Sequence, residues 1–272
     1  MVEEIYYTDV KQICQSVLSK YNVDFTGMAS TSFRRRIVKA MNTSSINSVG
    51  ALIEKLEASE VFFQSFCKDL IVDNTEFFRD PSFWRKMKEE VLPRYVSQAS
   101  VRIWLPGCAS GEELFSLCIM LKEQGLLDKS RIIASEISDK IFDRIRLGQY
   151  PIKNMEIALS NYERFEGKFK LENYYKEVGG SAIFDSSLLK VVTFKKNFLG
   201  REDIGSSFDL IVCRNNLLYY GNALQDSALS MMVKNLFKGG FLAVGIKEDI
   251  SISPDYLTLI VVSQEEKIYA KK

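Results

Sequence analysis

VRIWLPGCASGEELFSLCIML, residues 101–121, joins an apolar run to a glycine-bearing turn and then to an amphipathic segment. The apolar run, Val101–Leu105, is typical of a buried parallel strand. After the turn at 107–111, leucines recur at helical spacing. A strand, a tight glycine turn and a helix form the unit in which a backbone can approach a nucleotide-like ligand closely. We therefore expect an α/β domain that binds its ligand at this turn.

The two acids that follow the turn, Glu112 and Glu113, indicate the charge of that ligand. They stand where a dinucleotide-binding fold opens its helix, and they would repel a pyrophosphate. A ligand with an ammonium or a sulfonium group would be attracted, which favours S-adenosylmethionine over NAD. The alternative is an ordinary strand-turn-helix with a solvated acidic first turn, because acids favour helix N-termini.

The composition of the 272 residues excludes several classes of chemistry. The chain has no histidine, which removes histidine metal sites, histidine general bases and Ser-His-Asp triads, and we expect no metal. A net charge of +1 carries no signature of a nucleic-acid-binding protein. The five cysteines lack C-x-x-C spacing and are typical of reduced thiols in a cytoplasmic protein. We find no signal peptide and no window long enough to insert in a membrane.

Residues 1–72 carry helical patterns without a strand signal, which predicts a separate all-α N-terminal domain. Helices are expected at 9–18, from Thr31 or Ser32 to about 41, at 48–56 and at 60–71. The second helix carries the densest positive cluster of the chain, which we call the basic cluster: Arg34, Arg35, Arg36 and Lys39. Two interpretations stay open, namely a solvated face or a docking surface for an acidic partner.

Residues 73–100 are predicted to form a linker and a connecting helix. Pro81 is well placed to open that helix, because proline is tolerated in a first helical turn. Just before it, Arg79 follows two phenylalanines. This arrangement suggests a buried joint whose guanidinium faces a cleft.

The remainder, residues 101–272, is predicted to form the α/β domain, with a small antiparallel β insertion at about 166–193. Glu136 ends the second strand, where such folds bind ribose hydroxyls. A strong buried strand at 208–213 ends in a polar cluster that begins with Arg214, at the ligand-binding edge of an open sheet. Further helices are expected at 139–147, 154–165 and 225–237, and further strands at 241–246, 257–262 and 267–270.

An ordered set of short segments resembles the chemotaxis receptor methyltransferase (CheR) family. The segments are NTEFFRD (74–80), WLPGCASGEE (104–113), ASEI (134–137), GQY (148–150), NFL (197–199), FDLIVCRN (208–215) and KGGFL (238–242). Each segment alone is a weak signal. Together with an all-helical start that carries an arginine-rich helix, they span nearly the whole chain.

The resemblance implies a Rossmann-like S-adenosylmethionine methyltransferase sheet preceded by the all-α domain. It implies transfer of the methyl group to glutamate side chains on chemoreceptor cytoplasmic helices, which gives glutamate methyl esters and S-adenosylhomocysteine. A glutamate is already ionised at neutral pH, so this chemistry needs placement and electrostatics rather than a histidine base. The basic cluster would then dock the receptor, and we expect a cytoplasmic monomer that binds no nucleic acid.

The site residues of the family can be matched to this sequence position by position. Arg79 is expected to orient the incoming carboxylate and Tyr219 to lie near the transferred methyl group. Glu113 is expected to bind the amino end of the cofactor, and Glu136 its ribose, where the family more often has aspartate. The other cofactor-binding positions are Thr75, Gly107, Asn197, Phe198, Arg214 and Asn215. The sequence departs from the family pattern at Asp73, Leu114, Ile246 and 216–218.

Two alternatives to an active glutamate methyltransferase stay open. One is a relative that binds S-adenosylmethionine, or only a receptor array, without catalysis; the departures at Asp73 and Ile246 favour it. The other is a small-molecule methyltransferase on the same fold, in which the basic cluster would have no macromolecular partner.

Overall fold

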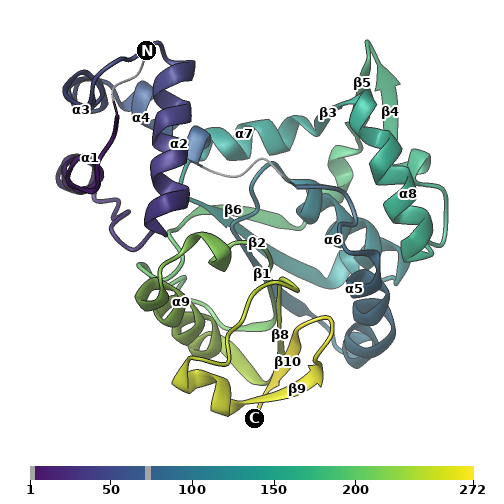
Figure 1. The fold of residues 1–272 in the computed structure, drawn as a ribbon. Coiled ribbons are helices and arrows are strands. Elements are labelled where there is room, and N and C mark those ends of the chain that lie inside the picture. The colour runs from purple at the N-terminus through teal and green to yellow at the C-terminus, as the bar shows by residue number, and fades with distance from the viewer. Residues whose placement is uncertain (1–3, 71–74) are drawn as a thin grey trace.

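A mixed sheet forms the centre of the computed structural model, which describes residues 4–70 and 75–272 (Figure 1). Within these residues, seven strands are arranged in the order β6-β2-β1-β7-β8-β10-β9. The strands β6, β2, β1, β7 and β8 run parallel, and β10 and β9 add an antiparallel edge. Their bounds are β1 Val101–Pro106, β2 Ser130–Glu136, β6 Val192–Lys196, β7 Phe208–Cys213, β8 Leu236–Val244, β9 Leu259–Ser263 and β10 Ile268–Lys271. This is the Rossmann-like sheet that the sequence predicts.

The helices cover both faces of this sheet. The apolar side chains of α6 pack on one face together with α5, and α9 packs on the other face with the N-terminal helices. The bounds are α5 Pro81–Lys86, α6 Glu112–Glu123, α7 Asp139–Leu147, α8 Met155–Phe165 and α9 Asn222–Lys234. No helix in the described ranges has the length and apolar character that a membrane span requires.

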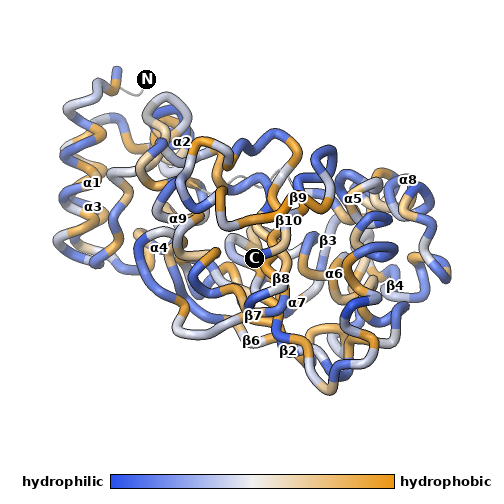
Figure 2. Tube along the Cα trace, turned by 90° about the horizontal axis from the view of Figure 1, so that it is seen from below, coloured by the Kyte–Doolittle hydropathy of each residue, from blue (hydrophilic) through white to orange (hydrophobic). Residues whose placement is uncertain are grey.

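The N-terminal region is helical, as predicted, with α1 Tyr7–Tyr21, α2 Ser30–Thr43, α3 Val49–Ala58 and α4 Glu60–Leu70. Hydrophilic and hydrophobic stretches alternate along α1 and α3 in Figure 2, as expected for helices with one buried face. The predicted caps of α2 are wrong: Thr31 and Ser32 lie inside the helix, and Ala29 precedes it without a side-chain cap. The Ala29 N–H instead donates to the carbonyl oxygen of Tyr219 at 2.8 Å, so a tertiary contact sets where α2 begins.

The buried residues of the N-terminal helices are continuous with one face of the sheet. Their apolar cluster includes Trp104 of β1 and Phe198, which follows β6. The rings of Phe25 and Phe198 lie 5.8 Å apart, and Asp24 pairs with Arg201 at 3.1 Å. The N-terminal helices therefore share a core with the sheet.

The predicted joint at 77–80 packs in the apolar cluster that covers the opposite face of the sheet. Phe77 stacks on Phe184 with 4.5 Å between ring centroids, and Phe78 stacks on Phe165 at 4.8 Å. Both are almost fully buried. Phe78 and Asp80 have φ angles of 51° and 56°, in the left-handed region that non-glycine residues rarely adopt. After α5 the chain continues as a π-helical turn, Met87–Val91, and a 3₁₀ turn, Leu92–Tyr95.

The small antiparallel sheet differs in extent from the predicted insertion at 166–193. It consists of β3 Gln149–Pro151, β5 Ser181–Phe184 and β4 Tyr175–Val178, in that order, so its first strand lies before the predicted range. The segment Val192–Lys196 instead joins the large sheet as β6, parallel to β2. Phe194 on β6 packs on Phe142 of α7 with 5.1 Å between the rings. This long-range contact helps to hold the segment in the large sheet.

The boundary between α9 and β8 lies earlier than predicted. Helix α9 covers Asn222–Lys234 rather than 225–237, and β8 begins at Leu236 rather than at 241. Leu236 pairs with Phe208 across a register shift in the β7–β8 ladder. The spacing of Leu236 in the sequence fits a helix, but its pairing with β7 makes it part of β8.

We expect Phe78→Ala to lower the free energy of unfolding by about 3–5 kcal/mol, because it removes a fully buried ring. Urea denaturation measures this change. Phe169→Ala is the matched control, since Phe169 is 53% exposed, and it should shift stability by no more than about 0.5 kcal/mol. Equal effects of the two substitutions would show that Phe78 does not anchor the joint.

Candidate functional site

A pocket lies at the carboxyl ends of β1, β2 and β7, beside the N-terminal helices. Its space, including the open mouth, is about 1070 Å³. All the residues predicted to be catalytic or to bind the cofactor line it: Thr75, Arg79, Gly107, Glu113, Glu136, Asn197, Phe198, Arg214, Asn215 and Tyr219. The fold thus brings together residues that are up to 144 positions apart along the chain.

The turn after β1 is shaped by close approach of another loop. Gly107 has a φ of 68°, and a Cβ atom there would lie 1.8 Å from the Asn216 side-chain nitrogen. A larger residue would therefore clash as well as strain the backbone. Further along the turn, the Ala109 N–H donates to Glu136 Oε1 at 2.9 Å. The turn and the end of β2 are joined through this carboxylate.

Glu136 lies at the carboxyl end of β2 and is 6% exposed. Its second oxygen accepts a hydrogen bond from the Ile137 N–H at 3.1 Å. Burial raises the pKa of Glu136, and the two backbone N–H donors act in the opposite direction. A carboxylate held in this way has remaining lone pairs for hydroxyl donors in the pocket.

The two acids after the glycine turn lie in different environments, and the one matched to the cofactor by the resemblance, Glu113, is the one that faces the pocket. Only Glu113 lines the pocket. Glu112 points to the linker, where it accepts hydrogen bonds from the hydroxyl groups of Thr75 and Ser110. Burial raises the pKa of both carboxyl groups. The pocket therefore gains one carboxylate from this pair.

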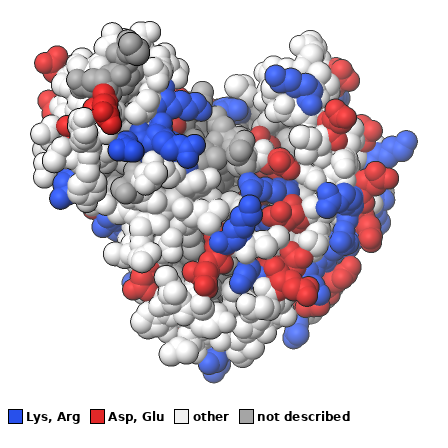
Figure 3. Space-filling model, viewed as in Figure 1, with Lys and Arg blue, Asp and Glu red and all other residues white. Residues whose placement is uncertain are grey.

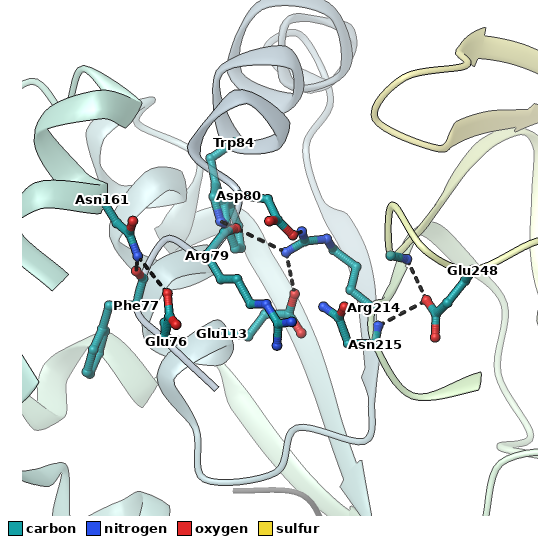
Figure 4. A network of polar contacts seen from close by, with 11 residues as sticks. Glu76, Phe77, Arg79, Asp80, Trp84, Glu113, Asn161, Arg214, Asn215 and Glu248 are labelled. Carbon is teal, nitrogen blue, oxygen red and sulfur yellow. Dashed lines mark hydrogen bonds and ion pairs between the residues drawn. The ribbon is translucent and has the colours of Figure 1, made fainter. Parts of the chain in front are cut away.

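Arg214 is the most enclosed charge of the pocket wall, with a side chain 1% exposed. Figure 4 shows it between two acids: Nη2 lies 2.6 Å from Asp80 Oδ2, and Nη1 lies 3.0 Å from Glu113 Oε1. Its guanidinium also lies 4.0 Å from the centre of the Phe83 ring. Nη1 additionally reaches the Arg79 carbonyl oxygen at 3.4 Å. Arg214 therefore joins the end of β7 to the linker and to α6.

Glu248 is a site residue that the sequence analysis missed. It is 2% exposed, and its carboxylate accepts from the N–H group of Asn215 at 3.0 Å (Figure 4) and from that of Leu217 at 2.7 Å. It also accepts from the Gly245 N–H. Asn215 has a φ of 58°, so the loop it begins is strained and needs this support. An acid just beyond an apolar strand, at the ligand-binding edge, was the available signal.

Asn197 carries an unsatisfied acceptor in the wall of the pocket. Its side-chain nitrogen donates to the Glu202 carbonyl oxygen at 2.8 Å. Its Oδ1 is buried and has no hydrogen-bond partner among the described residues. Buried polar atoms are rarely left without a partner, so this oxygen suits a ligand with an amino group.

The four residues of the basic cluster do not share one face. Arg34, Arg35 and Lys39 are exposed, and Lys and Arg side chains gather over α2 beside a hollow in the molecular surface (Figure 3). Arg36 turns inward instead and lines the pocket. Its guanidinium carbon lies 3.9 Å from the centre of the Tyr219 ring.

The positions that depart from the family pattern lie in different environments. Leu114 is fully buried in α6, and Ile246 is 40% exposed. Asn216 packs against Gly107 in the pocket wall. Asp73 lies outside the described residues.

The arrangement suits a ligand that carries amines and hydroxyl groups. Glu113 can attract a cation, Glu136 can accept from hydroxyl groups, and Asn197 can accept from an amine. Phe198 adds an apolar surface beside Asn197. The guanidinium groups of Arg79 and Arg36 also line the pocket, so an anionic group can be held there as well.

Comparisons with known proteins agree with this geometry. A family model described as "CheR methyltransferase, SAM binding domain" matches residues 73–265, and "CheR methyltransferase, all-alpha domain" matches residues 8–71. The protein Cher3 of Pseudomonas putida is 33% identical over 245 residues, which cover 90% of each chain. A chemotaxis protein methyltransferase of Listeria monocytogenes is 27% identical over 254 residues, covering 93% of this chain and 92% of the relative. Chemotaxis protein methyltransferase 1 of Pseudomonas aeruginosa is 26% identical over 240 residues, covering 84% and 85%.

We expect Glu248→Gln to lower the free energy of unfolding by about 1–3 kcal/mol, because the amide group would place a donor against backbone N–H donors. Urea denaturation measures the loss. The exposed Glu54→Gln on α3 serves as the control and should leave stability unchanged. If Glu248→Gln were as stable as wild type, the carboxylate would not be what holds the 215–218 loop.

Proposed function

Since the chain belongs to the CheR methyltransferase family, we propose that it methylates glutamate side chains on chemoreceptor cytoplasmic helices, with S-adenosylmethionine as the methyl donor. The products are glutamate methyl esters and S-adenosylhomocysteine. The observation that carries the proposal is the convergence of the predicted catalytic and cofactor-binding residues on one pocket. The names of the Listeria and Pseudomonas aeruginosa relatives support the chemotaxis context.

The residues in the pocket fit S-adenosylmethionine. Glu136 would hold the ribose hydroxyls, and Glu113 the amino group of the methionine end. The unsatisfied Asn197 Oδ1 would accept from the adenine amino group, with Phe198 beside it. When bound, the cofactor supplies a methyl group that is already activated by the sulfonium charge.

The remaining residues of the pocket would handle the acceptor. We assign to Arg79 the orientation of the glutamate carboxylate, because a guanidinium matches a carboxylate in geometry and charge. Tyr219 would lie beside the transferred methyl group. A glutamate is ionised at neutral pH, so the chain needs no proton acceptor, which is consistent with its lack of histidine. Its residues would act by placement and electrostatics.

The exposed part of the basic cluster would dock the substrate. Arg35 and Lys39 are four residues apart on α2, so they lie on one face of the helix beside the pocket. We propose that they attract acidic residues of a receptor helix and bring its glutamates to the mouth of the pocket. We propose that the protein performs this function in the cytoplasm and as a monomer.

Transfer of a labelled methyl group to chemoreceptor-containing membranes from the same cell tests the function. We expect label on the receptor band that alkali releases as methanol, which identifies a carboxyl methyl ester. Cofactor binding by calorimetry without any transfer would favour a non-catalytic relative. Transfer to small molecules but not to receptors would favour a small-molecule methyltransferase, and either result would overturn the proposal.

Glu113→Gln should weaken binding of S-adenosylhomocysteine by about 10- to 150-fold, because it removes a charge-assisted bond of about 1.5–3 kcal/mol to the amino group. Burial raises the pKa of Glu113, so this carboxyl group becomes protonated at a higher pH than an ordinary glutamate does. Wild-type affinity should therefore fall as the pH is lowered from 7.5 towards 5, and the slope should be smaller in Glu113→Gln. Calorimetry over this pH range measures both effects.

Glu54→Gln on α3 is the control, because Glu54 is an exposed acid that does not line the pocket. It should bind S-adenosylhomocysteine with the wild-type pH dependence. If the two variants lost the same affinity and slope, Glu113 would have no specific role at the amino end of the cofactor.

A further inference from the structure

The segment that carries Tyr219 is held by the N-terminal helical region. The Ala29 N–H donates to the Tyr219 carbonyl oxygen at 2.8 Å, and the Gly221 N–H donates to the Gly27 carbonyl oxygen at 2.7 Å. Between these bonds, Met28 and Tyr220 form an isolated antiparallel β-bridge. The backbone on both sides of Tyr219 is therefore tied to the chain just before α2.

The Tyr219 side chain is contacted by the same region through Arg36. The guanidinium carbon of Arg36 lies 3.9 Å from the centre of the Tyr219 ring, a distance at which cation and ring attract each other. The guanidinium is in turn held by the Leu70 carbonyl oxygen, 2.6 Å from Nη1, at the end of α4. Arg36 is half-buried and stays charged at neutral pH. Two N-terminal helices thus place a cation over the ring.

This position sets Arg36 apart from its neighbours on α2. Arg35 and Lys39 are exposed, and neither lines the pocket. Arg34 is exposed and reaches the Ile5 carbonyl oxygen at 3.5 Å, within the N-terminal region itself. A docking surface would need Arg36 to face the solvent, whereas its guanidinium faces the pocket and Tyr219.

We propose that Arg36 is a positioning residue that fixes the Tyr219 ring at the pocket, so that the N-terminal domain completes the active site as well as docking the substrate. The inference rests on the proposed function, because it takes Tyr219 as the residue beside the transferred methyl group. An arginine is needed for this task, since its planar group can stack on the ring while it donates to Leu70. Lysine offers one compact cation and can satisfy only part of the arrangement.

Methyl-transfer kinetics with receptor membranes give the first test. Arg36→Met should lower kcat by about 5- to 30-fold, the range expected for loss of a partly desolvated cation–ring contact. Its receptor KM and its affinity for S-adenosylhomocysteine should stay within about twofold of wild type. Arg36→Lys should recover part of the lost kcat. Arg94→Met is the control, because Arg94 is exposed and lies outside both the pocket and the basic cluster, and it should keep the wild-type kcat and receptor KM.

A second measurement reads the position of Tyr219 without catalysis. Protein labelled with ¹³C in the tyrosine rings is compared by NMR, and the Tyr219→Phe variant assigns the Tyr219 signal. That signal should shift in Arg36→Met and stay unchanged in Arg35→Met.

The outcomes separate the inference from the proposed function. A rise in receptor KM with an intact kcat would make Arg36 a docking residue and overturn the inference. An unchanged Tyr219 signal in Arg36→Met would overturn it as well. If wild-type protein transferred no methyl group to receptors, the proposed function would fail, and the Tyr219 signal would still decide whether Arg36 positions the ring.

Discussion

A buried guanidinium, that of Arg214, joins the segments on which the pocket depends. It pairs with Asp80 in the linker and with Glu113 at the start of α6, and it extends from the end of β7. Removing one partner of a buried ion pair costs about 3–5 kcal/mol, because the remaining charge stays desolvated. The linker is strained beside this contact, with Phe78 and Asp80 at positive φ. The ion pairs and the stacked phenylalanines together hold the linker in a conformation that it would not adopt alone.

Buried carboxylates organise the loops around the same pocket. Glu136 fixes the glycine turn through the Ala109 N–H, and Glu248 fixes the 215–218 loop through several backbone N–H groups. Charge-assisted bonds to backbone donors are stronger than neutral ones, and each acid holds a loop that follows a parallel strand. These carboxylates therefore hold the loops that form the pocket walls. A preformed site loses less entropy on binding than one that must order its loops.

Much of the fold follows from local sequence pattern, because strand, turn and helix at 101–147 have strong periodicity and clear capping glycines. Long-range contacts decide the features that were predicted wrongly. Tyr219 sets the start of α2, strand pairing with Phe208 sets the start of β8, and the packing of Phe194 places β6 in the large sheet. In the pocket, a resemblance between sequences indicated which residues to consider. Only the structure separates Arg36 from its exposed neighbours, since orientation within a helix depends on what packs against it.

We propose that S-adenosylmethionine binds in this pocket in one orientation. A crystal structure of the chain with S-adenosylhomocysteine would test this orientation. We expect the amino group at Glu113, the ribose hydroxyls at Glu136 and the adenine amino group at Asn197, with Arg214 still paired to Asp80. A nucleoside bound outside this pocket, or bound in it with the ribose away from Glu136, would rule out this orientation.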